Sequence, residues 1–584
     1  MYFIDRPLRR LMETALGHEP ADLIIRDGSL IDVYSGRLLP HYSVAIRGQW
    51  IAYVGPDADV MIGEKTRIIE ARGRVISPGY IDPHTHLANY CDISDLLRYA
   101  IPGGTTTFVT EVESYAFGLG AEGFRAFLEQ IRNRPVKIFC LLPPMLTLSP
   151  AAESLFIKGK DFTDLLGDEL VLGLGESYWQ NAILPPDDRI LKLIRETQEN
   201  GKSIQGHAAG AYGQKLAAYA AAGAQSCHEA VSPDDVLARL ESGLYPMLRE
   251  GYIRQDLESI RPLIGKIDLR RCTLCTDGVD PELILTRGYY HGVVQKAVDM
   301  GIEPIEAVRM ASLNPAEHLG LDHLVGGLAP GRFADILLLP ELGDMEPELV
   351  LSQGRIVSDK GRVTVPLPRV PYPATLLKTV NIPPITPEGL TVPPASCERA
   401  GTIRTMDIQS NGLVAREGSA PVPEDSREVL PDPSKDLLKI VFIDRVSGRG
   451  ERFIGFVKGW GQQTGAVASS LAWDVSGVVA IGTNDLDLAV AVNRVIQDQG
   501  STVLAVNGDV RLAVPFPVAG YVSEEGIEDL AAKLKDLEQR LFDLGVTSPT
   551  PHLTLITLPS AAIPFMRITE KGYFRFREGD YVGI

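Results

Sequence analysis

The chain has 584 residues, of which 45% are hydrophobic, and its 75 acidic residues outnumber its 57 lysines and arginines to leave a net charge of −18. A chain of this length and hydrophobic content can form roughly two to four domains, each with a buried core. The acidic excess argues against a nucleic-acid backbone or an anionic membrane as the main partner, because both are negatively charged.

The first 75 residues and the segment 326–365 share one strand-like sequence pattern. Residues 1–20 predict a helical lead-in, and from residue 21 onwards short apolar segments alternate with Gly and Asp turns. The same pattern returns at 334–339 and 350–357. We therefore expect residues 1–75 and 326–365 to build one small β-sandwich domain from both flanks of the region between them.

The region 76–325 alternates strand-like apolar runs with helical periodicity. This alternation, with eight candidate strands, predicts an α/β fold of the closed (β/α)8 TIM-like barrel type. An open doubly wound sheet is the alternative, but no G-x-G-x-x-G follows the first strand. The candidate strands are 76–84, 105–111, 136–142, 171–176, 203–207, 225–228, 245–249 and 273–277.

Two further segments complete the chain. Residues 366–435 are rich in Pro, Ser, Glu and Thr and predict an extended connector with little regular structure. Residues 436–584 have their own strand patterns and amphipathic helical patterns around 486–498 and 526–544. We expect this last segment to be a separate C-terminal α/β domain.

Residues with metal-ligand chemistry end several of the candidate barrel strands. His84 and His86 are spaced i, i+2, which points both side chains to one face of a strand. In a closed barrel the C-terminal strand ends meet at one rim, so these side chains are expected to converge. Four of the chain's ten histidines fall there. The candidate metal ligands are His84, His86, Glu176, His207, His228 and Asp277.

Charge and reach suggest a role for each candidate ligand. His84, His86 and Asp277 would bind one divalent ion, and His207 and His228 a second. Glu176 is long enough to bridge the two ions through its two carboxylate oxygens. The ions would lower the pKa of a water molecule. Asp277 would take the water's proton and return it to the leaving group, so Asp277 and Glu176 are the candidate catalytic residues.

The cysteines and the apolar runs bear on the cellular compartment. Six cysteines in so long a chain do not form a disulfide framework, and Cys272 and Cys275 have C-x-x-C spacing without a second pair. We read both as buried residues of a strand. No segment reaches about 18 apolar residues, so we expect a cytoplasmic protein that neither is secreted nor spans a membrane.

The H-x-H run, behind Pro-Gly and Asp at the end of a strand-like segment, resembles the metal-dependent amidohydrolase superfamily. Over nearly its whole length the chain is similar to the adenine deaminase family. The resemblance implies hydrolysis of adenine to hypoxanthine and ammonia, a binuclear site of manganese, iron or zinc, a purine or related heterocycle as substrate, and a homodimer or higher homo-oligomer. The matching motifs lie at 203–210, 222–229, 313–317, 328–335, 455–461, 465–470, 482–485 and 489–494.

This sequence departs from the family's motifs at positions that can set substrate choice. The departures lie at Ala88, at 111–114, at Gly278 and at 473–477, where tryptophan replaces a histidine. Our candidates for substrate binding are Glu229, Glu111 and Trp473. Polar groups that line a pocket discriminate strongly between substrates. The alternative function is therefore hydrolysis of another aminated heterocycle or a cyclic amide, with weak or no activity on adenine. A non-catalytic scaffold is a third possibility, against which Asp277 and the four histidines count.

Overall fold

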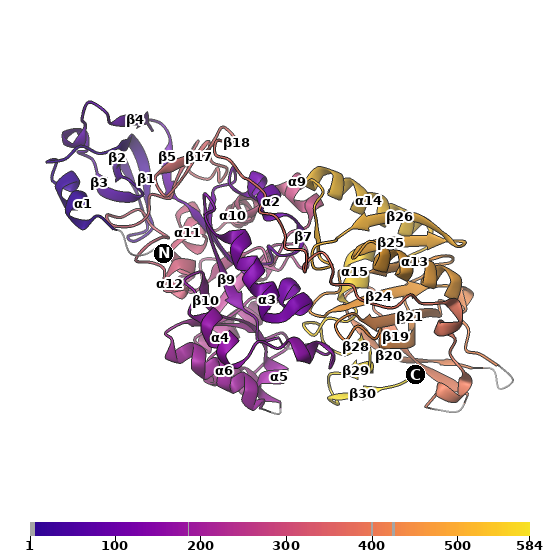
Figure 1. Cartoon of the computed structure of the whole chain (residues 1–584). Coiled ribbons are helices and arrows are strands. Elements are labelled where there is room, and N and C mark those ends of the chain that lie inside the picture. The colour runs from indigo at the N-terminus through magenta and orange to yellow at the C-terminus, as the bar shows by residue number, and fades with distance from the viewer. Residues whose placement is uncertain (1–5, 146, 185, 399–400, 423–426) are drawn as a thin grey trace.

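The computed structural model describes residues 6–145, 147–184, 186–398, 401–422 and 427–584. Figure 1 shows the early strands at one end of the molecule, the C-terminal elements at the other, and the long central part of the chain between them. The predicted fold class is confirmed: a (β/α)8 barrel carries a small β domain built from both flanks and a C-terminal α/β domain. No helix in the described part of the chain is long and apolar enough to cross a membrane.

The small β domain is a nine-stranded sheet whose strands come from both flanks of the barrel. It runs in the order β18-β17-β16-β15-β5-β1-β2-β3, with β4 paired to β1. Its core joins Ile25, Val44 and Ile76 to Ile336 and Leu351. Helix α1 (Leu8–Ala15) falls within the predicted helical lead-in. The strands are β1 (Leu23–Asp32), β2 (Arg37–Arg47), β3 (Trp50–Gly55), β4 (Arg67–Glu70), β5 (Val75–Pro78), β15 (Ile336–Leu339), β16 (Leu349–Ser352), β17 (Arg355–Asp359) and β18 (Arg362–Val363).

The chain passes from this sheet into the barrel at Gly79, so the strand predicted over 76–84 is in fact two strands. The amide of Gly79 donates to the carbonyl of Asp335 in the small domain at 3.0 Å. The amide of Tyr80 donates to Gly104 in the barrel region at 3.0 Å. A Cβ atom at position 79 would lie 2.3 Å from Thr106 Oγ1, so only glycine fits there.

The barrel strands pair in parallel within sheets of five and three strands, which gives eight strands in all. Two backbone hydrogen bonds of 3.0 Å link these sheets into a closed barrel. Gln225 donates to Ile204, and Asp277 donates to His84. The strands are β6 (Tyr80–Thr85), β8 (Thr105–Thr110), β9 (Lys137–Leu142), β10 (Val171–Tyr178), β11 (Ser203–His207), β12 (Ser226–Cys227), β13 (Tyr245–Arg249) and β14 (Thr273–Cys275).

Helices between and after these strands bury apolar faces in the main core. Helix α8 shows how the sequence starts one: the Ser232 hydroxyl accepts from the amide of Asp235, and Pro233 occupies the first turn. The helices are α2 (Ile93–Ala100), α3 (Glu113–Ile131), α4 (Gly159–Leu166), α5 (Trp179–Ile183), α6 (Asp188–Glu199), α7 (Gln214–Ala222), α8 (Pro233–Glu241), α9 (Pro281–Arg287), α10 (Tyr290–Asp299), α11 (Pro304–Met310) and α12 (Leu313–His318).

The C-terminal domain is built on an eight-stranded sheet in the order β20-β19-β22-β21-β24-β23-β25-β26. Helix α13 (Asp485–Gln497) packs its apolar face on this sheet, and α14 (Ile527–Asp543) and α15 (Pro551–Thr557) follow. The sheet strands are β19 (Thr402–Ile408), β20 (Ala415–Pro421), β21 (Leu438–Asp444), β22 (Arg452–Lys458), β23 (Ala466–Ser469), β24 (Gly477–Gly482), β25 (Ser501–Val506) and β26 (Asp509–Pro515). A three-stranded sheet, β28 (Met566–Thr569), β29 (Gly572–Arg575) and β30 (Asp580–Val582), completes it.

Strands β19 and β20 correct the predicted connector, because both lie within 366–435 and belong to the C-terminal sheet. Their polar and charged residues hid the strand pattern: in β19, Arg404 and Thr405 separate the apolar residues Ile403 and Met406, and all four are buried. The boundaries given for the other domains stay predictions.

The C-terminal domain docks on the barrel through backbone contacts. Strand β27 (Val522–Ser523) pairs in parallel with β7 (Tyr90–Cys91), which follows the first barrel strand. The Ser476 hydroxyl donates to the carbonyl of Phe117 in α3. Because these contacts hold the domain at the C-terminal ends of the barrel strands, they place it beside the candidate site.

Candidate metal centre and cavity

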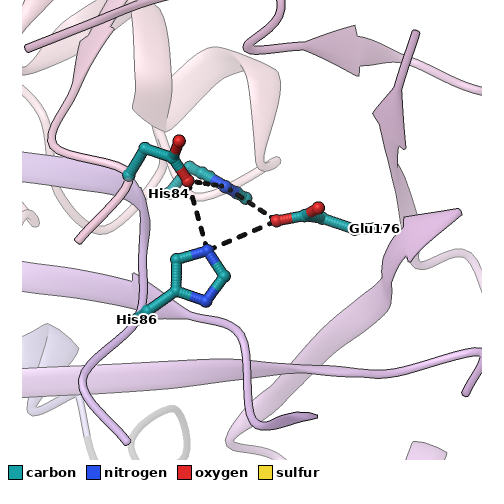
Figure 2. Close-up of side chains that lie close together, drawn as sticks. His84, His86 and Glu176 are labelled. Atoms are coloured by element: carbon teal, nitrogen blue, oxygen red, sulfur yellow. Dashed lines mark hydrogen bonds and ion pairs between the residues drawn. The ribbon is translucent and has the colours of Figure 1, made fainter. Parts of the chain in front are cut away.

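Four predicted ligands meet at the barrel rim. His84 and His86 come from the end of β6, Glu176 from β10, and Asp277 follows β14. The Nε2 atoms of both histidines lie 3.2 Å from Asp277 Oδ1. Glu176 Oε1 lies 3.2 Å from His84 Nε2 and 3.4 Å from His86 Nε2. Figure 2 shows both imidazoles and the Glu176 carboxylate pointing toward one another. These four side chains could hold one metal ion.

A second group of potential ligands shares Glu176 with the first. His207 ends β11 and His228 follows β12, and with Glu176 they could hold another ion. Glu229 lies beside them, with Oε1 3.2 Å from His207 Nε2 and 3.4 Å from His228 Nε2. The structure thus brings together all six predicted ligands and adds Glu229, which we had assigned to substrate binding.

Asp277 is held in place by its backbone and by the residue before it. Its φ of 53° is left-handed, a conformation that Asp tolerates better than most residues. The Thr276 hydroxyl donates to Asp82 Oδ2 at 2.7 Å, and Tyr289 donates to the same oxygen at 2.8 Å. This buried network fixes the turn at which the Asp277 side chain enters the site.

Arg249 is a buried cation of the site that the sequence analysis missed. It ends β13, and its side chain is 2% exposed. Its Nη1 lies 2.9 Å from Asp277 Oδ2, its Nη2 3.0 Å from Glu229 Oε2, and its Nε 2.7 Å from Asp256 Oδ2. The sequence offered one signal for Arg249: it is a charged residue at the end of the seventh barrel strand, the same position at which predicted ligands end other strands.

Glu111, a predicted substrate contact, lies behind the ligand cluster and not in the wall of the cavity. Its Oε1 lies 3.8 Å from His84 Nδ1 and accepts from the Glu176 amide at 3.1 Å, and it does not line the cavity. Glu113 lies in the same way 3.4 Å from His86 Nδ1. A carboxylate behind a ligand histidine orients the ring. Glu111 therefore lies behind the ligands, hydrogen-bonded to the backbone of Glu176, and its assignment to substrate binding stays a prediction.

Burial and neighbouring charge shift the pKa values in the cluster in opposite directions. Burial opposes a charge on His84, but hydrogen bonds with Asp277 and Glu176 raise its pKa to about 10. Burial and the nearby His84 lower the pKa of His228 to about 3. Burial raises the pKa of Glu111 well above its ordinary value, and Glu113 and Glu176 add to the effect. A ligand imidazole must be neutral, so a cation that binds here must displace the proton of His84.

The donor set fits divalent metal ions. Glu176, Glu229 and Asp277 are all largely buried, and the described contacts place the Arg249 cation beside two of them, Glu229 and Asp277. Buried carboxylates require compensating charge. Imidazole nitrogens and carboxylate oxygens are ordinary ligands of zinc, iron and manganese. The surplus of buried negative charge therefore matches cations held between the two ligand groups.

A cavity of about 190 Å³ opens on these ligands and is closed in part by the C-terminal domain. His86, Glu176, Asp277 and Glu229 line it from the barrel. Trp473 lines it from the C-terminal domain, with its ring centroid 5.4 Å from that of His86. Of the three predicted substrate contacts, Glu229 and Trp473 therefore lie at the cavity. Other C-terminal residues in the wall are Leu413, Val414, Thr557, Ser560, Ala562, Ile563 and Pro564.

The other histidines and the cysteines lie outside the cluster. His318 pairs with Gln205 Oε1 at 3.1 Å and His552 with Thr502 Oγ1 at 3.1 Å, both in buried surroundings. All six cysteines are free thiols, and Cys272 and Cys275 are both buried, as the strand assignment predicts.

Comparison with known proteins identifies the class and then the family. The fold and the site define a hydrolase of the amidohydrolase class, and the Amidohydrolase family model matches residues 75–357. The model of the adenine deaminase C-terminal domain matches residues 413–580.

Full-length relatives carry the comparison further. An adenine deaminase of Moorella thermoacetica is 33% identical over 97% of this chain and 97% of its own. One of Rubrobacter xylanophilus is 34% identical over 97% and 95%, and one of Cenarchaeum symbiosum 31% identical over 100% and 95%. The chain belongs to the adenine deaminase family, which confirms the predicted resemblance.

Proposed function

We propose that the protein hydrolyses adenine to hypoxanthine and ammonia. The observation that carries the proposal is the pair of overlapping His and carboxylate groups at the barrel rim. They open on a cavity with an aromatic wall in a chain of this family. Water supplies the oxygen of the new C–O bond at the purine carbon, and the exocyclic amine leaves as ammonia.

Two divalent ions, manganese, iron or zinc, complete the site in this proposal. His84, His86 and Asp277 would hold one and His207 and His228 the other, and Glu176 belongs to both ligand groups. Glu229 lies within reach of the second group and adds a carboxylate to it. Such ions supply Lewis acidity, which lowers the pKa of water.

Asp277 carries the proton in this mechanism. Arg249 holds its Oδ2 at 2.9 Å, which leaves Oδ1 facing His84 and His86. Oδ1 accepts a proton from the attacking water and donates it to the amine as the C–N bond breaks. Burial would raise the pKa of Asp277, but His228, His84 and His86 hold it well below its ordinary value, which keeps the carboxylate ionised.

The polypeptide also provides the surroundings in which the reaction occurs. The Glu111 carboxylate, by accepting from the Glu176 amide, fixes the end of β10. Apolar side chains of the C-terminal domain line the cavity and limit the access of water. We further propose a cytoplasmic homodimer or higher homo-oligomer, in keeping with the family and with the free thiols.

Trp473 and the apolar wall around it favour a second candidate function. This wall, in place of the family's histidine, suits another planar aminated heterocycle or a cyclic amide, with adenine a poor substrate.

Ammonia release from adenine and pterins, together with ring opening of hydantoin-like rings followed by chromatography, decides between the two functions, because hydrolysis of a cyclic amide releases no ammonia. Purified protein loaded with manganese, iron or zinc is supplied with adenine and with pterins and hydantoin-like rings. Adenine turnover with kcat/KM above about 10⁴ M⁻¹s⁻¹, which His84→Ala abolishes, supports adenine deamination. No turnover of adenine together with turnover of another ring supports the alternative.

A further inference from the structure

Two loops of the C-terminal domain give the cavity an apolar wall. One loop connects β19 to β20, and the other leads from α15 into β28. Their lining residues share a cavity with the ligands His86, Glu176 and Asp277, so a ring bound at the cluster is enclosed in part by these two loops. We name the five lining residues of the loops, Leu413, Val414, Ala562, Ile563 and Pro564, the outer wall.

One buried guanidinium joins the two loops of the outer wall. Arg567 lies in β28 and is fully buried. Its Nε donates to the carbonyl of Ile563 at 2.9 Å, and its Nη2 donates to the carbonyl of Leu413 at 2.7 Å. Both acceptors belong to residues that line the cavity. A single side chain therefore fixes the backbone of both halves of the wall.

Further contacts keep the two loops side by side next to this link. Ala415 and Phe565 form an isolated parallel β-bridge. The Arg416 guanidinium lies 4.0 Å from the centroid of the Phe565 ring. These contacts lie beside the lining residues, whereas the hydrogen bonds of Arg567 reach the lining residues themselves. The position of Leu413 and Ile563 in the wall thus depends directly on Arg567.

Arg567 is a buried cation without a carboxylate partner. In the described part of the chain no acidic side chain pairs with it, and its Nη1 has no hydrogen-bond partner. Burial lowers the pKa of Arg567 to about 9. A buried charge without a counter-charge is destabilising, and a long apolar side chain could fill a similar volume without that cost. What the guanidinium contributes is its planar fork, which reaches two carbonyl oxygens at once.

We infer that Arg567 is a positioning residue of the active site, which holds the outer wall where it encloses a substrate ring beside the metal ligands. This inference rests on the proposed reaction at the cluster. A site that is competent for only a fraction of the time binds with an apparent Kd divided by that fraction. Asp277 and the ligand histidines stand on barrel strands that Arg567 does not contact. Substrate binding should therefore depend on Arg567 more than the chemical step does.

The test compares wild-type protein with Arg567→Met and Arg567→Lys in steady-state kinetics on adenine. We expect Arg567→Met to raise KM about 5- to 150-fold, which corresponds to two lost hydrogen bonds, and to leave kcat nearly unchanged. Arg567→Lys keeps a cation with N–H donors but not the planar fork, so it should recover part of the loss. If Arg567→Met does not fold, Arg567→Lys supports the same comparison with a smaller effect.

Arg404→Met is the matched control. Arg404 is also a buried arginine of the C-terminal sheet, and its side chain is 8% exposed. It pairs with Glu398 at 2.7 Å and with Glu417 at 2.9 Å, and neither residue lines the cavity. We expect its KM to stay at the wild-type value even if its stability falls. A comparable rise of KM in Arg404→Met, an unchanged KM in Arg567→Met, or a loss confined to kcat would overturn the inference.

Hydrogen–deuterium exchange measured by mass spectrometry reports on the wall without any turnover. We expect faster exchange at 409–416 and 560–567 in Arg567→Met and not in Arg404→Met. If wild-type protein releases no ammonia from adenine, the proposed function fails, and the exchange rates still decide the inference. Faster exchange confined to the two loops of Arg567→Met supports a wall that Arg567 fixes, and unchanged exchange refutes it.

Discussion

Replacing Arg249 with methionine tests how the active site balances its buried charge. The change keeps a long apolar side chain and removes a cation whose three carboxylate partners are Glu229, Asp256 and Asp277. Removing one partner of a buried ion pair costs about 3–5 kcal/mol, because the remaining charge stays desolvated. For a domain of the barrel's size, about 1 kcal/mol moves the melting temperature by about 2–4 °C. We therefore expect the melting temperature of chelator-treated protein to fall by about 6–20 °C.

Metal loading should reduce this loss, because cations bound near Glu229 and Asp277 replace part of the missing charge. The assay is thermal unfolding followed by circular dichroism, with and without added manganese or zinc. Arg254→Met is the matched control: Arg254 also pairs with Asp256, but its side chain is 40% exposed, and such pairs contribute about 0–1 kcal/mol. Equal shifts in the two variants, or no difference between loaded and chelator-treated Arg249→Met, would refute the charge-balance argument.

Three further outcomes follow from the site and the core. His207→Ala should lose one of about two bound ions per chain by elemental analysis, and an unchanged metal content would remove His207 from the ligand set. Asp277→Asn should lower kcat on the order of 10²–10⁴-fold, and an effect confined to KM would assign Asp277 another role. Burial lowers the pKa of His552 to about 4, so the unfolded chain binds a proton below about pH 6.5 that the folded protein excludes. Stability is then lost as the pH falls from about 6.5 toward 4, at about 1.4 kcal/mol per pH unit. His552→Gln should flatten this dependence in denaturant titrations, and exposed His41→Gln should not.

The ligand set was readable from the sequence because each ligand follows a local signal. His84, Glu176, His207 and Asp277 stand at or just after the end of an apolar strand. Parallel strands of a barrel have their C-terminal ends at one rim, so the sequence position already implied convergence. The strand predicted at 225–228 is shorter in the structure, where β12 comprises only Ser226–Cys227.

The sequence-based boundaries failed where long-range contacts decide pairing. The run 76–84 reads as one strand, yet it divides between two sheets at Gly79, because Gly79 bonds to Asp335 and Tyr80 bonds to Gly104. Strand β19 was not predicted because polar residues interrupt its apolar ones and because one of its two partners, β22, lies beyond the predicted connector.

The sequence by itself determined the barrel, its flanking β domain and the residues that converge at the rim, since periodicity and strand ends are local properties. Only the tertiary structure decided that Arg249 pairs with three carboxylates, that Glu111 lies behind His84, and that Trp473 lines the cavity from the C-terminal domain. These roles depend on burial and on charges that are distant in sequence and adjacent in space. Desolvation makes such interactions strong, and no local pattern encodes which groups will share a dry interior.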